Sequence, residues 1–212
     1  MNENNIAVRL FFSKTGRAKY ISALDLITCF QRAIRRTDIP VWHTQGFNPH
    51  TYVNVNLPLS LGSEGTNESM DIKLTEQMSF DLICEKLNAV LPPDIRIIKA
   101  AFPVRKHTEI EKSVYSVNIS CDFKKLESFM KSESIEVEKK TKKGITTLDI
   151  KPFTEIKDYE EGRFTLIMPS GCDFTLNPSL FFDAFEKYSG EEIQQLSIIR
   201  TGILSKDGSQ FE

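Results

Sequence analysis

The chain has 212 residues, of which 40% are hydrophobic and 15 are Phe, and its net charge is −2. This length fits one ordinary domain or two small ones, and this apolar content is typical of packed cores, not of a disordered chain. No basic leader precedes a long apolar run, and no apolar run is long enough to span a bilayer. We therefore expect a cytoplasmic protein without a membrane segment.

The net charge hides an asymmetry along the chain. Residues 1–55 contain seven Lys or Arg against three Asp or Glu, a balance of +4, so the remainder carries −6. A basic first quarter in an otherwise acidic chain favours an anionic partner for that quarter.

The four cysteines lie dozens of residues apart and form no C-x-x-C pair; they are Cys29, Cys84, Cys121 and Cys172. This spacing encodes neither a local zinc site nor an iron–sulfur cluster. We expect no metal and no resident cofactor, with the cysteines as buried free thiols.

The first half alternates between strand and helix patterns. Residues 6–13 alternate with the period of a half-buried strand, and Ser22 can cap a helix that must end before Pro40. Next come two strands, a helix and a strand, at residues 51–57, 68–74, 79–91 and 94–102. The predicted order is β-α-β-β-α-β.

The second half repeats this order after a boundary near residues 103–109. A strand, a helix capped by Asp122, a hairpin, a strand, a helix capped by Asn177 and ended by Gly190, and a last strand are predicted. The fold class is therefore α+β, with two ferredoxin-like β-α-β-β-α-β units in tandem, at residues 1–105 and 110–205. The last residues, 206–212, are expected to be a frayed polar tail.

The first predicted helix has a guanidinium-rich face. At helical spacing, Arg32, Arg35 and Arg36 share a face with Asp25 and Thr28. The opposite, apolar stripe consists of Leu24, Ile27, Phe30 and Ile34. The arginine face is either a solvated helix surface or a grip on phosphate or carboxylate, for which the planar guanidinium is suited.

The strand predicted at residues 51–57 alternates polar and apolar side chains. If Val53 and Val55 face the helices, the residues between them face the open side of the sheet. That side then carries Tyr52, Asn54 and Asn56 beside Arg9, Phe11 and Ser13. Such a surface suits single-stranded nucleic acid or a planar metabolite, or it packs against the second half of the protein.

The loop before this strand, "HTQGFNPH", places His43 and His50 around Gly46 and Pro49. Two histidines without nearby carboxylates are too few ligands for a metal site. The glycine and proline fix the path of the loop, which is a structural role; the alternative is that Asn48 and His50 also contact a ligand. We expect His50, Tyr52 and Asn54 to lie near Asp25 or near the arginines of the preceding helix.

A second basic segment, "KKTKKG" at residues 139–144, forms the predicted tip of the hairpin in the second half. It is a further candidate for anion contact, although lysines on a turn more commonly serve solubility.

Three segments resemble a bacterial family described as radical SAM-linked or radical SAM-associated proteins, a domain of unknown function. They are "FSKTGRAKYISALDL", "RAIRRTDIPVWHTQGFNPH" and "LPLSLGSEGTNESMDIKL". The residues shared with the family pattern are Lys14, Gly16, Ser22, Asp25, Arg32, Arg35, Arg36, Gln45, Gly46, Phe47, Asn48, Pro49, His50, Pro58, Leu59, Gly62 and Glu68. Ala23 and Thr37 depart from it, because a histidine and an alanine are frequent there.

The resemblance implies an accessory role beside a separate radical SAM protein, with RNA or another anionic molecule as ligand. The chain itself lacks the three closely spaced cysteines of a radical SAM cluster. We therefore expect a non-catalytic binding or adaptor protein. The alternatives are an RNA-processing or RNA-modifying enzyme, which needs an irreplaceable acid, base or nucleophile, and a small-metabolite-binding protein.

Overall fold

The computed structural model describes residues 5–141 and 144–212. Within these residues it contains four α-helices together with strands that form antiparallel ladders, so the predicted α+β class is confirmed. The chain divides into two compact units. Unit 1 is the chain up to Glu109 together with Gln210–Glu212, and unit 2 is Ile110–Ser209.

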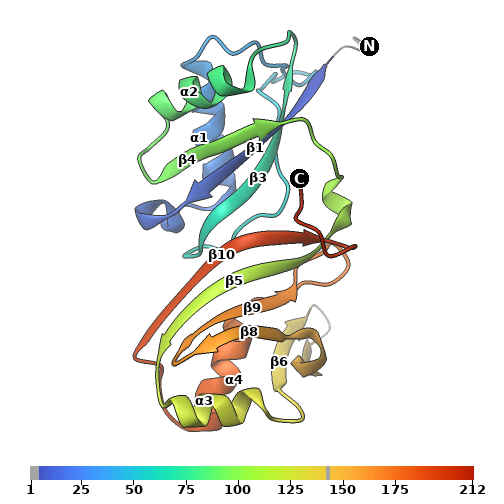
Figure 1. The fold of residues 1–212 in the computed structure, drawn as a ribbon. Helices are drawn as coiled ribbons and strands as arrows, with labels where there is room; N and C mark the ends of the chain where they lie inside the picture. Colours follow the sequence, from blue (N-terminus) through green and yellow to red (C-terminus); the bar gives the residue numbers. More distant parts are fainter. Residues whose placement is uncertain (1–4, 142–143) are drawn as a thin grey trace. The chain divides into compact units, whose positions relative to one another are not determined.

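The described part of unit 1 follows the predicted element order. Its elements are β1 (Ile6–Lys14), the 3₁₀ turn η1 (Gly16–Tyr20), α1 (Ala23–Arg35), β2 (Val53–Val55), β3 (Glu64–Leu74), α2 (Phe80–Val90), β4 (Ile95–Ala101) and the 3₁₀ turn η2 (His107–Glu109). Three of the strands lie in the order β4-β1-β3 (Figure 1). The short strand β2 pairs with β3, and each of these pairs is antiparallel.

One face of this sheet packs against both helices. Phe30 of α1 meets Phe12 of β1 with ring centroids 5.2 Å apart, and Ile83 and Leu87 of α2 are fully buried in the same core. The buried side of α1 consists of Leu26, Phe30, Ala33 and Ile34. Leu24, predicted as part of this stripe, is 76% exposed because it lies on the first turn, beyond the sheet-facing side.

The end of the chain packs against unit 1 and is not a frayed tail. Phe211 is 1% exposed, and its ring lies 4.3 Å from the guanidinium carbon of Arg9. The backbone oxygen of Glu212 accepts hydrogen bonds from the Val104 and Arg105 amides. Residues 206–212 are mostly polar, so their composition did not indicate that the one aromatic residue, Phe211, would anchor them.

The described part of unit 2 has a similar order with an inserted hairpin. Its elements are β5 (Ile110–Ser120), α3 (Phe123–Met130), β6 (Glu136–Thr141), β7 (Gly144–Asp149), the 3₁₀ turn η3 (Lys151–Phe153), β8 (Glu155–Glu160), β9 (Arg163–Pro169), α4 (Ser179–Ser189) and β10 (Gln195–Ser205). Neighbouring strands in the order β10-β5-β9-β8 are antiparallel, while β6 and β7 form a separate two-stranded sheet.

Local sequence signals explain the helices of unit 2. The Asp122 carboxylate accepts hydrogen bonds from the amides of Lys124 and Lys125 and so caps α3. Gly190, with φ of +70°, ends α4 in a left-handed conformation that favours glycine. Figure 1 shows α3 and α4 next to each other. In the core, the ring centroids of Phe129 and Phe181 lie 5.3 Å apart. The Asn177 cap is displaced by one residue, because Pro178 takes the N-cap position and the Asn177 side chain accepts from the Ser179 amide.

Candidate functional site

Helix α1 begins with a reciprocal cap that fixes Asp25. The Ser22 hydroxyl accepts a hydrogen bond from the Asp25 amide at 3.1 Å and donates one to the Asp25 carboxylate at 2.7 Å. The sequence therefore holds this carboxylate at the first turn, where it also complements the positive end of the helix dipole.

Asp25 is one of the residues that line a cavity of about 500 Å³ in unit 1. The cavity lies along α1 and the end of α2. Its lining residues are Asp25, Thr28, Cys29, Arg32, Ala33, Arg36, Val90, Leu91 and Pro92. The lining positions on α1 are three or four residues apart, which is the spacing of one helix face. The cavity thus unites Asp25, Arg32 and Arg36, while Arg35 is exposed on α1 outside the lining.

Among the described residues, the guanidinium groups of the two cavity arginines, Arg32 and Arg36, have no ion-pair or hydrogen-bond partner. Burial raises the pKa of the Cys29 thiol between them, while the positive charges of Arg36 and Arg32 act in the opposite direction. The cavity therefore presents two guanidinium groups beside a thiol that stays protonated near neutral pH.

The loop that contains Asn48 and His50 is an excursion from the sheet. Val41 pairs with Leu74, and Val53 pairs with Ile72, two residues away on β3. The chain therefore leaves and rejoins the sheet at almost the same place. The His50 ring nitrogen Nδ1 lies 3.0 Å from the Thr44 hydroxyl and 3.2 Å from the Asn48 carbonyl oxygen. Contacts inside the loop therefore orient His50.

Tyr52 and Asn54 do not join the arginine cavity. Val53 and Val55 pack into the core beside α1, as predicted, and so the alternate side chains point to the opposite face of the sheet. There Lys73 lies over the rings of Trp42 and Tyr52, at 5.1 and 4.9 Å. The expectation that Tyr52 and Asn54 lie near the α1 arginines is wrong, because the sheet separates them.

The same face is less open than expected around β1. Arg9 and Phe11 are buried, and Asn56 donates hydrogen bonds to the Ser69 hydroxyl and the Asp71 carboxylate. Burial, followed by the negative charge of Asp71, raises the pKa of Tyr52. This part of the predicted ligand surface is occupied by contacts within unit 1.

Several residues of the family-like motifs have structural roles that the sequence did not suggest. Lys14 is 1% exposed, and its ammonium donates to the carbonyl oxygens of Ile21 at 3.1 Å and Lys19 at 3.4 Å. A Cβ at Gly65 would lie 2.1 Å from the carboxylate of the buried Glu68. Lys14 therefore holds the chain that leads into α1, and Gly65 leaves room for the buried Glu68 carboxylate.

Two further findings concern the described residues only. No group of three or more His, Cys, Asp or Glu among them is arranged to hold a metal ion. None of their helices has both the length and the apolarity needed to cross a membrane. The predicted basic tip at residues 139–144 includes Lys142 and Lys143, which lie outside the described residues.

Fold and site together define a two-unit α+β protein with an arginine-lined cavity in unit 1. The family model DUF2344, described as an uncharacterized protein conserved in bacteria, matches residues 7–177. The chain therefore belongs to this family, and the expected membership of a bacterial family of unknown function is confirmed. No curated protein matches the sequence. The association with radical SAM proteins stays a prediction.

Proposed function

We propose that this protein is a non-catalytic adaptor that holds an anionic group of its ligand in the arginine cavity of unit 1. The observation that carries the proposal is the pair of guanidinium groups, Arg32 and Arg36, that line one cavity without a carboxylate partner among the described residues. An arginine whose guanidinium has no carboxylate partner is suited to bidentate binding of phosphate or carboxylate.

Single-stranded RNA is the proposed ligand. The basic first quarter of the chain favours a polyanion, and the half-buried Tyr52 with Asn54 adds a ring and an amide on the other face of the same sheet. We further propose that the adaptor presents the RNA to a separate radical SAM enzyme, for which the support is the resemblance of the motifs around Asp25 and Gly46. The strand orders of both units likewise support the proposal that each is a ferredoxin-like module.

Adjacent arginines provide the test. Binding of a mixed single-stranded RNA is measured against salt for the wild type, for Arg36→Ala and for Arg35→Ala, two variants with the same change of charge. For Arg36→Ala we expect weaker binding and a logarithmic salt slope that is shallower by about 0.7, the value for one lost phosphate contact on a single strand. Arg35→Ala should change both quantities less, because its side chain lies outside the cavity.

Equal effects of the two variants would show that RNA responds only to net charge and would contradict the cavity as its site. The enzyme partner is tested separately, by measuring whether the purified protein binds a purified radical SAM protein from the same bacterium. Binding that Arg36→Ala leaves intact would place the partner surface elsewhere on the chain.

A further inference from the structure

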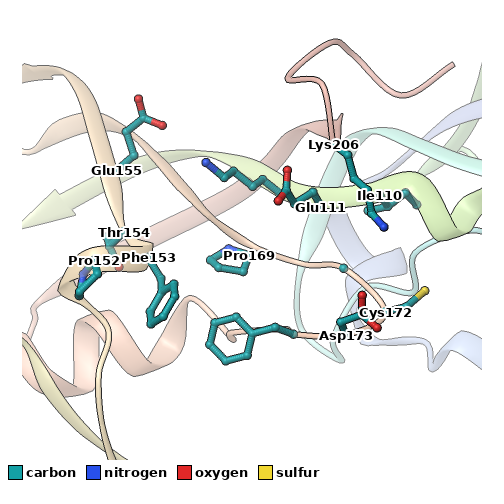
Figure 2. A pocket seen from close by; sticks show the side chains of 13 residues that line it. Ile110, Glu111, Pro152, Phe153, Thr154, Glu155, Pro169, Cys172, Asp173 and Lys206 are labelled. Carbon is teal, nitrogen blue, oxygen red and sulfur yellow. The ribbon is translucent and has the colours of Figure 1, made fainter.

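Unit 2 contains a cavity of its own, of about 510 Å³ (Figure 2). This volume lies within the range of about 300–1,000 Å³ that is typical of small-molecule sites. The cavity lies between η3, the adjoining start of β8, the first residues of β5 and the turn after β9. No motif in these segments predicted a function from the sequence.

One end of the cavity combines apolar side chains with Thr154 and Glu155 (Figure 2). Figure 2 shows Pro152 and Phe153 at this end, with Pro169 toward the middle. Phe153 and Phe174 form an edge-to-face pair with ring centroids 5.0 Å apart, and 42% of Phe153 remains exposed. An exposed ring that already has one aromatic neighbour can take a second apolar or aromatic group with further burial of surface.

The other end is charged, with both signs represented. Figure 2 shows Lys206, Asp173 and Cys172 there, with Glu111 nearby on β5. Lys112, the residue after Glu111, also lines the cavity. No side-chain ion pair or hydrogen bond joins Lys112, Lys206, Glu111 or Asp173 to another described residue. The remaining carboxylate of the cavity, Glu155, lies at the end that carries Phe153 and is paired with Lys157 at 3.0 Å.

The wall that bears Asp173 is tightly tied to the sheet. The Ser170 amide donates to the Glu111 carbonyl oxygen at 2.8 Å, and the Gly171 amide donates to the Phe174 carbonyl oxygen at 3.1 Å. A Cβ at Gly171 would lie 2.8 Å from the Ile110 carbonyl oxygen, so the turn approaches β5 as closely as glycine allows. The cavity is therefore a preformed feature of unit 2.

From this arrangement we infer that the cavity in unit 2 binds a small zwitterion with an apolar body, of the class of aromatic or large apolar α-amino acids. A ligand with only negative charge would face Glu111 and Asp173, and one with only positive charge would face Lys112 and Lys206. A ligand that carries an ammonium and a carboxylate matches both pairs, while its side chain contacts Phe153 and Phe174. This site is separate from the arginine cavity and does not depend on the proposed function.

The direct test is calorimetric titration of the full chain with L-phenylalanine. The same titration with 3-phenylpropionate, which lacks the ammonium, and with 2-phenylethylamine, which lacks the carboxylate, separates the two charges. We expect saturable binding of the amino acid and roughly tenfold weaker binding of each analogue, as the loss of one charged hydrogen-bond partner implies.

Variants then locate the site. Lys206→Ala and Asp173→Ala should each weaken L-phenylalanine binding about tenfold. Lys131→Ala should leave it unchanged, because this exposed lysine at the end of α3 does not line the cavity. Thermal melting of each variant checks that it is folded. As an independent measurement, L-phenylalanine should slow the alkylation of Cys172, the exposed thiol of the cavity, by iodoacetamide.

The inference is overturned by the absence of saturable binding, by equal binding of 3-phenylpropionate or 2-phenylethylamine, or by binding that neither variant weakens. It is also overturned if bound L-phenylalanine leaves the alkylation of Cys172 unchanged while the variants alter only stability.

Discussion

Arg9 and Asp71 form a bidentate ion pair between the neighbouring strands β1 and β3. The Arg9 guanidinium donates through Nε at 2.7 Å and through Nη2 at 2.9 Å to the two carboxylate oxygens of Asp71. Its third donor, Nη1, reaches the backbone oxygen of Glu212 at 2.9 Å. This buried guanidinium thus joins the sheet to the last residues of the sequence.

Removing one partner of this pair should strongly destabilise unit 1. In Asp71→Asn the buried positive charge of Arg9 loses its counter-ion, and breaking such a pair typically costs about 3–5 kcal/mol. Urea unfolding of the full chain measures the loss. The control is Lys99→Ala, which removes the exposed Lys99–Glu212 pair and should cost less than about 1 kcal/mol. Equal losses in the two variants would contradict a special role for the buried pair.

Phe211→Ala tests the anchoring of the C-terminal residues. This ring is buried against Arg9, so its truncation should cost about 3 kcal/mol through lost burial and the cavity that remains. Differential scanning calorimetry gives the change. An unaltered melting temperature would show that the tail is dispensable, as its polar composition had suggested.

Periodicity in the sequence predicted most elements because burial itself is periodic. Phe12 and Phe30 occupy the positions that their strand and helix patterns predicted for the core. The sequence did not indicate strand β8, because Glu155–Glu160 is mostly polar, largely exposed and without an apolar repeat. Among the described strands it pairs with β9 alone. Its irregular pairing near Asp158, with φ of +53°, further masks the pattern.

Of the arginine cavity, the sequence could predict only what depends on local helix geometry. Helical spacing placed Arg32 and Arg36 on one face, but the division between Arg36 and Arg35 depends on the end of α2, which no local pattern encodes. The sequence also suggested that Tyr52 would lie near these arginines. Only the three-dimensional position of the sheet shows that they lie on opposite sides.

Alkaline pH should weaken the fold through its partly buried thiols. Burial raises the pKa of Cys29, Cys84 and Cys121 above the ordinary value of 9.0. The unfolded chain therefore loses these protons first as the pH rises, so their contribution to stability is complete below pH 9.0 and decreases above it. Burial also raises the pKa of Tyr52 and Tyr159, so their contribution to stability likewise decreases, at a higher pH.

This effect is measured as the free energy of unfolding between about pH 8 and about pH 10. Cys29→Ala should flatten the decline, because it removes one titrating thiol. Cys172→Ala is the matched control, since this thiol is exposed. A slope that is identical in both variants and in the wild type would contradict the assignment to Cys29.

The loop between Val41 and Val53 should depend on glycine geometry and not on its exposed aromatic residue. Gly46 has φ of +134°, and an added Cβ there would meet no atom within 4 Å, so Gly46→Ala introduces backbone strain alone. We expect a cost of roughly 1 kcal/mol, together with faster hydrogen exchange of the Thr44 amide, which donates to the His50 carbonyl oxygen. The neighbouring change Phe47→Ala, at a fully exposed ring, should stay within about 0.5 kcal/mol. If Phe47→Ala instead destabilises the protein more than Gly46→Ala, the ring has a packing role that its exposure argues against.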